Sequence, residues 1–135
     1  MRLFIPAREK MGYFPWASIF SFSSVRYIHR SVFSSSADNS VYALRVNGYR
    51  AALSQARLEH NYDHFLESDY LIEKAYHALL SHLMQHPEIT AVCCEADVTV
   101  PGILRAIHDA GKVPGKDIAV ISFDGLDATA YAIPS

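Results

Sequence analysis

The chain has 135 residues, half of them apolar and 19% charged, so it can fold as one domain with a packed core. Its formal net charge of −2 excludes a general electrostatic attraction to nucleic acid or to an anionic membrane surface. No apolar run approaches the roughly 20 residues of a membrane-spanning helix, so we expect no membrane partner. Cys93 and Cys94 are adjacent and are expected to be reduced thiols in the core, as in a cytoplasmic protein.

Residues 1–40 follow no sustained period and contain nine serines. The stretch VRYIHRSVF, residues 25–33, is compatible with one strand, and SSSADNS, residues 34–40, is typical of a loop. We therefore expect a poorly patterned N-terminal segment up to residue 40 and a folded lobe over 41–135.

From residue 41 onward, helix and strand patterns alternate. A helix is predicted over 41–60 and a short strand over 61–67. Ser68 or Asp69 can cap a long helix that ends before Pro87. One wide apolar face of that helix is predicted to consist of Leu71, Ile72, Ala75, Tyr76, Leu79, Leu80, Leu83 and Met84.

The alternation continues to the end of the pattern. A buried strand is predicted over ITAVCC, residues 89–94, and Asp97 can cap the next helix, with Pro101 in its first turn. Gly111 is placed to end that helix, and DIAVISF, residues 117–123, is the last strand. Because parallel strands need crossover connections, this order predicts an α/β fold with a parallel sheet flanked by helices.

Two acids follow predicted strands. In open parallel sheets, ligands bind beyond the carboxyl ends of the strands, where Asp97 and Asp124 are expected. A carboxylate there can accept hydrogen bonds from the hydroxyls of a small polar ligand, or it can cap a turn or a helix. The pattern alone leaves both roles open for each acid.

Three stretches carry a family pattern. The first, RVNGYRAAL at residues 45–53, follows the pattern R-x-x-G-[FYW]-x-x-x-L. The last is YAIPS, at residues 131–135. The longest stretch, residues 87–125, reads PEITAVCCEADVTVPGILRAIHDAGKVPGKDIAVISFDG. In this order and spacing the three resemble the C-terminal lobe of the effector domain of the LacI/GalR family of bacterial transcription repressors, over about residues 40–135.

The resemblance implies one lobe of a periplasmic-binding-protein-like (type I) fold, in which two lobes close on a sugar or related small molecule. Arg45 would grip the ligand with its fork of donors, and Asp124 would accept hydrogen bonds from ligand hydroxyls. Ala96 stands where the family often has an asparagine that contacts ligand, which weakens the case for sugar binding in the usual manner. The ligand-binding candidates that the resemblance implies are Arg45, Ser68, Asp69, Asp97, Phe123 and Asp124.

AREKMGYFPWA, residues 7–17, is similar to the end of the family's DNA-binding headpiece, or matches it by coincidence. A recognition helix that could enter the major groove is not evident. We therefore expect a truncated regulator that senses a small-molecule effector and reaches DNA only through a headpiece that it lacks. The alternative is a stand-alone binding or dimerisation module that forms a homodimer or pairs with a full-length regulator.

Other chemistries find little support in the sequence. His77, His82 and His86 are expected to be solvated or rim residues, because no third metal ligand with clear geometry accompanies them. The chain has no G-x-S-x-G elbow and no phosphate-binding glycine loop. We expect no enzyme activity, no metal and no cofactor.

Overall fold

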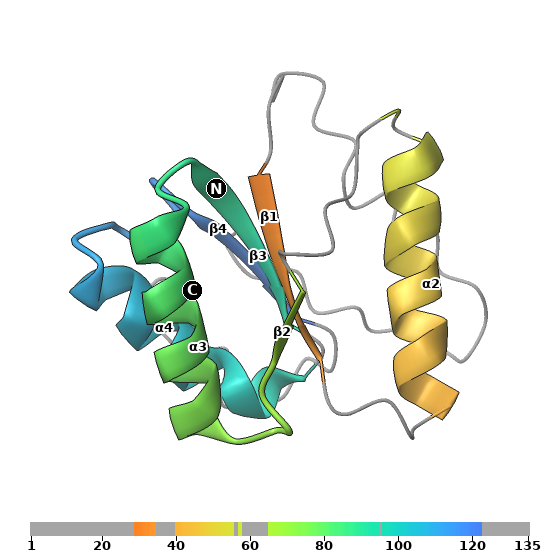
Figure 1. Cartoon of the computed structure of the whole chain (residues 1–135), viewed down its shortest axis with the longest axis horizontal. Coiled ribbons are helices and arrows are strands. Elements are labelled where there is room, and N and C mark those ends of the chain that lie inside the picture. Colours follow the sequence, from red (N-terminus) through yellow and green to blue (C-terminus); the bar gives the residue numbers. More distant parts are fainter. Residues whose placement is uncertain (1–28, 35–39, 56, 58–64, 95, 123–135) are drawn as a thin grey trace.

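The computed structural model describes residues 29–34, 40–55, 57, 65–94 and 96–122, with the backbone alone at 29–34, at 40–45 and at residue 52. Within this part, four strands form one sheet in the order β2-β1-β3-β4, and every neighbouring pair is parallel (Figure 1). The strands are β1 (His29–Ser34), β2 (Phe65–Glu67), β3 (Ile89–Cys94) and β4 (Ala119–Ser122). The helices are α2 (Ser40–Gln55), α3 (Ile72–Gln85) and α4 (Val100–Asp109), and the 3₁₀ turn η2 (Asp97–Thr99) precedes α4. The predicted parallel α/β class is confirmed.

Strand β1 lies in the middle of the sheet. Val32 is the register partner of Phe65 on one side and of Cys93 on the other. Residues 29–34, in the segment expected to be poorly patterned, thus belong to the same sheet as the later strands and overlap the strand that was considered over 25–33. The segment HRSVFS does not alternate apolar and polar residues, so its place in the sheet could not be inferred from periodicity.

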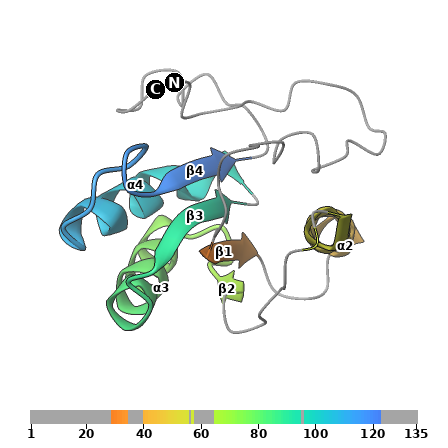
Figure 2. The ribbon, with the colours of Figure 1, turned by 90° about the horizontal axis from the view of Figure 1, so that it is seen from above.

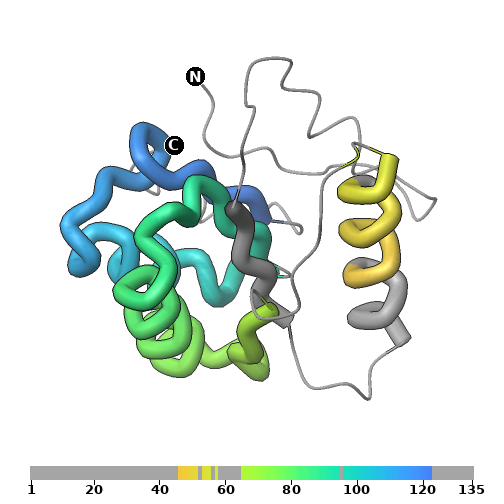
Figure 3. The backbone as a smooth tube through the Cα atoms, turned by 45° about the horizontal axis from the view of Figure 1, so that its top comes forward, coloured from red at the N-terminus to blue at the C-terminus, as the bar shows by residue number. Residues whose placement is uncertain are grey.

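The helices cover both faces of the sheet. Figure 2 shows α3 and α4 on one side and α2 on the other, and Figure 3 shows the same separation. On the α2 side, the buried ring of Tyr49 meets the ring of Phe65 edge-on, with centroids 5.9 Å apart. On the other side lies the main core, which consists of Ala75, Leu79, Leu83, Ile89, Val92, Cys94, Val100, Ile103, Ala106, Ile107, Ile118 and Val120.

The start of α3 lies very close to α4. A Cβ atom added at Gly102 would overlap the backbone carbonyl of Ile72. A glycine at this position lets the two helices approach more closely than any other residue would. The close approach holds the beginning of α3 against the first turns of α4.

The predicted C-terminal signals of the helices are confirmed. Gly111 has a left-handed φ of 74°, and its amide donates to the carbonyl of His108 at 2.9 Å. The amide of Lys112 donates to the carbonyl of Ile107 at 3.1 Å, which completes a Schellman cap. Pro101 lies in the first turn of α4, and α3 ends before Pro87, both as expected.

The predicted N-terminal caps are wrong. The N-cap residue of α3 is Leu71, and the residue before η2 is Ala96; neither position has a side-chain capping bond. Ser68, Asp69 and Asp97 therefore do not cap these helices. Asp69 pairs with Lys74, whereas Ser68 and Asp97 are buried.

The apolar face of α3 is narrower than predicted. Leu71, Ile72 and Met84 are 59%, 46% and 77% exposed, whereas His82, expected at the rim or in solvent, is only 8% exposed. The stripe that faces α4 and the sheet is formed by Ala75, Leu79, His82 and Leu83, as spacings of three and four residues allow. The ring of His82 lies beside that of His86, with centroids 4.5 Å apart.

Candidate functional site

The carboxyl ends of the four parallel strands meet at one edge of the sheet, here called the carboxyl edge. Ser34 is the register partner of Glu67, Phe33 of Cys94, and Cys94 of Ser122. The last residues of the four strands therefore lie along the same edge of the sheet. This is the edge at which parallel α/β sheets bind ligands.

Asp97 lies in the interior beneath this edge. It is 2% exposed, Ser122 is 1% exposed, and the Ser122 hydroxyl donates a hydrogen bond to the Asp97 carboxylate. The neighbouring Thr99 is also buried, and its hydroxyl donates to the carbonyl of Ala96 at 2.9 Å. The role of Asp97 in the structure is thus a buried link to the end of β4.

A strained turn follows β2. The amide of Leu71 donates to the carbonyl of Ser68 at 2.8 Å, and the two residues between them, Asp69 and Tyr70, have φ values of 48° and 60°. Left-handed conformations are uncommon for residues other than glycine and cluster at functional sites. Ser68 is 3% exposed, so this predicted ligand contact lies in the interior.

Asp69 pairs with the first turn of α3. Its carboxylate accepts a hydrogen bond from the Lys74 ammonium at 2.5 Å, and this bond raises the pKa of Lys74. Both side chains are about 40% exposed, so water reaches the pair. The pair connects the strained turn to the first turn of α3, because Asp69 lies inside the strained turn and Lys74 lies on the helix.

Tyr70 is a residue that the sequence analysis missed. Its side chain is 38% exposed beside the carboxyl edge, where an aromatic ring can pack against an apolar ligand face. An aromatic residue shortly after a predicted strand end was the available signal.

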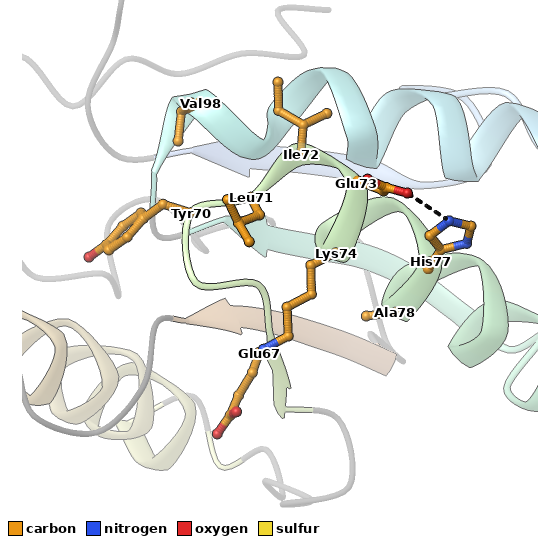
Figure 4. A pocket seen from close by; sticks show the side chains of 9 residues that line it. All are labelled: Glu67, Tyr70, Leu71, Ile72, Glu73, Lys74, His77, Ala78 and Val98. Carbon is orange, nitrogen blue, oxygen red and sulfur yellow. Dashed lines mark ion pairs between the residues drawn. The ribbon is translucent and has the colours of Figure 1, made fainter.

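A cavity of about 730 Å³ opens beside the turn (Figure 4). Three exposed apolar side chains at its wall, Leu71, Ile72 and Val98, form what we call the α3 face. Charged groups of both signs surround it, including Glu73, which is 3.9 Å from His77. The cavity is lined by Glu67, Tyr70, Leu71, Ile72, Glu73, Lys74, His77, Ala78 and Val98.

Three predicted contacts fall where the structure gives no side chain. Arg45 lies on α2, which is described there as backbone only. Phe123 and Asp124 lie outside the described residues, directly after β4. Their roles remain predictions.

The buried thiols belong to the core. Cys93 and Cys94 are free and are 5% and 0% exposed, and burial raises the pKa of Cys94 well above its ordinary value. The described residues contain no cluster of three or more His, Cys, Asp or Glu side chains arranged to hold a metal ion. Among the same residues, no helix has the length and apolar character needed to cross a bilayer.

The sheet order and the carboxyl edge define a ligand-binding type of α/β lobe. Residues 5–133 match the family described as periplasmic binding proteins and sugar binding domain of the LacI family, and the chain belongs to this family. The predicted family and fold are therefore confirmed.

Among curated relatives, the transcriptional repressor PurR of Histophilus somni is 35% identical over 92 residues, which cover 67% of this chain and 27% of the repressor. The ribose operon repressor of Haemophilus influenzae is 30% identical over 95 residues, which cover 70% of this chain and 29% of that protein. The chain thus spans less than a third of the length of these relatives.

Solved structures agree with the family. A regulatory protein of the LacI family from Chloroflexus aggregans superposes with a TM-score of 0.72 and 25% identity, over 78% of this chain and 38% of that one. The transcription regulator CcpA of Lactococcus lactis superposes with a TM-score of 0.70 and 26% identity, over the same shares of the two chains.

Proposed function

We propose that the chain is the effector-sensing lobe of a LacI-type transcription regulator, and that its effector is a sugar or a related polar small molecule. The family is defined by a sugar-binding domain, and the matched relatives are transcriptional repressors. The observation that carries the proposal is the carboxyl edge, where parallel strands end together and a strained turn presents Tyr70.

The chemistry of this edge suits a sugar. A pyranose or furanose ring has an apolar C–H face that can pack on the Tyr70 ring, and hydroxyls that need directional partners. Arg45 on α2 and Asp124 after β4 are the predicted donor and acceptor for those hydroxyls. A regulator uses such a site by binding its effector more tightly in one arrangement than in another.

Isothermal titration of the chain with a panel of neutral mono- and disaccharides, with purine bases as a second class, tests the proposal. We expect at least one sugar to bind. Tyr70→Ala should lower the affinity for that sugar about tenfold, which corresponds to about 1.4 kcal/mol of binding free energy. Met84→Ala is the control, because Met84 is 77% exposed at the opposite end of α3. Absence of binding by every sugar, or equal affinity in the Tyr70→Ala protein, would refute the proposal.

We also propose that the α3 face pairs with a second copy of the chain. Leu71, Ile72 and Val98 are 59%, 46% and 42% exposed around one cavity, and exposed apolar side chains of this extent mark contact surfaces. A twofold interface uses the same patch on both subunits, so the patch must complement itself. Acidic Glu73 and basic Lys74 and His77 border this face, which gives it groups of both signs.

Sedimentation velocity over a range of concentrations tests the pairing. We expect a reversible dimer that Leu71→Glu weakens at least tenfold, because two carboxylates would then be buried in the interface. Met84→Glu adds the same charge on the same helix away from the α3 face and should leave the dimer unchanged. A wild-type chain that sediments as a monomer at all concentrations would contradict the proposal.

A further inference from the structure

Asp97 is the one carboxyl group that is buried among the residues the structure describes. A carboxylate in the interior is costly unless a donor compensates for its lost hydration. The buried hydroxyl of Ser122 supplies such a donor. From the sequence, Asp97 was expected either to cap a helix or to contact a ligand. Neither role explains a hydrogen bond to the residue that ends β4.

The bond joins the turn after β3 to the end of the neighbouring strand β4. Asp97 and Ser122 are 25 residues apart in the chain, and Ser122 is the register partner of Cys94, the last residue of β3. The bond thus ties the segment that follows β3 to the residue that ends β4. The hydroxyl of Thr99 at the same edge differs, since it bonds only to Ala96 in its own turn.

We infer that Asp97 and Ser122 form a positioning clamp, which fixes the turn that follows β3 against the carboxyl end of β4. The inference rests on the proposed function, because the next residues in the sequence, Phe123 and Asp124, are predicted ligand contacts.

Amide hydrogen exchange on the full chain, followed by NMR, tests the clamp. Without the hydroxyl, the strand ends should open locally, so Ser122→Ala should raise exchange at Cys94 and Ser122 about tenfold. Exchange at Ile89 and Thr90, where β3 begins, should stay within about twofold of the wild type. Unchanged exchange at the strand ends, or an equal rise along the whole of β3, would overturn the inference.

Two further variants separate positioning from loss of a buried polar group. Thr99→Val removes an equally buried hydroxyl, because valine has nearly the same shape as threonine but no hydroxyl. It should leave amide exchange at Ser122 unchanged. Asp97→Asn keeps an oxygen that can accept from Ser122, so its exchange pattern should lie closer to the wild type than that of Asp97→Ala. If Asp97→Ala does not fold, Ser122→Ala and Thr99→Val decide the matter. A Thr99→Val protein that loosens β4 as much as Ser122→Ala does would count against the clamp.

A measurement of sugar binding tests the clamp separately from the proposed function. With whichever sugar of the panel binds the wild-type chain, Ser122→Ala should lower affinity about tenfold at a temperature where the variant remains folded. Thr99→Val should bind as the wild type does. If no sugar binds the wild-type chain, the proposed function fails, while the exchange data still decide whether the two strand ends are clamped. Equal sugar affinity in Ser122→Ala and the wild type would show that the pair does not position the ligand edge.

Discussion

At the scale of single residues, Asp109 has partners on both α3 and α4. Its carboxylate accepts hydrogen bonds from the Tyr76 hydroxyl on α3 at 3.0 Å and from the Arg105 Nε at 2.8 and 2.9 Å. His108 Nδ1 lies 3.2 Å away. The hydrogen bonds from Arg105 and then His108 are the main causes that lower the pKa of Asp109 from 3.8 to about 2.

We expect Asp109→Asn to lower the Tm slightly at pH 7, since the carboxylate is partly exposed and solvent screens its partners. Because the folded pKa is depressed, this contribution is fully present above about pH 4 and disappears as the pH falls towards 2. Thermal unfolding followed by circular dichroism should therefore show the two Tm curves converging over that window. Glu73→Gln is the control, and its curve should parallel the wild type because the Glu73 side chain is 89% exposed.

The sequence marked Asp97 and Asp124 as acids that follow strands, but it did not reveal the buried partner of Asp97. Asp97 could be flagged because it follows a strand pattern, whereas its partner Ser122 lies 25 residues further along and no local rule connects them. The position of Tyr70 after a predicted strand end was a signal in the sequence, but its left-handed backbone and its exposed ring depend on the fold. Local pattern therefore indicated the carboxyl edge, and the tertiary contacts identified the partner of Asp97.

At the scale of elements, helix ends that depend on local chemistry were predictable, whereas contacts between helices were not. Pro101 and Gly111 mark the two ends of α4 because their backbone restrictions act within one turn. The exposure of Ile72 depends on where α4 crosses α3, and that crossing is set by a close approach at Gly102. Periodicity gives a helix its apolar face but does not say how much of that face a neighbour covers.

Gly102→Ala should destabilise the fold by about 1–3 kcal/mol, because the added methyl group overlaps the carbonyl of Ile72 despite the better helix propensity of alanine. Urea unfolding monitored by circular dichroism measures the difference. Gly111→Ala provides a contrast, since no atom lies within 4 Å of its added methyl group and only the left-handed φ opposes it. Gly111→Asn should be milder than Gly111→Ala, and a stabilised Gly102→Ala protein would show that the helices are not in close contact there.

At the scale of the whole molecule, the sheet depends on a strand that the sequence pattern scarcely revealed. β1 supplies partners to both β2 and β3, so its removal would leave β2 without its neighbour in the sheet. A strand over residues 25–33 was compatible with the sequence, but the parallel class was predicted from β3, β4 and the helices between the later strands, which were patterned clearly. The position of β1 inside the sheet follows only from its neighbours.

A chain that begins at residue 35 should not unfold cooperatively, because β2 would have no partner strand and β3 would have one open side. A chain that begins at residue 25 retains β1 and is the matched comparison. Thermal unfolding of both should give a sharp transition for the longer chain alone. Cooperative unfolding of the shorter chain would show that the sheet forms without β1.

The central place of β1 also constrains how the protein is made. Val32 can pair with Cys93, its register partner in β3, only after Cys93 has left the ribosome. The pairing of β1 with β3 is therefore delayed during synthesis. At typical rates of synthesis, of roughly 5–20 residues per second, that delay lasts several seconds, and unpaired strands exposed for so long invite aggregation. Nascent chains halted before β3 should consequently be held by chaperones, whereas chains extended past β4 should escape them.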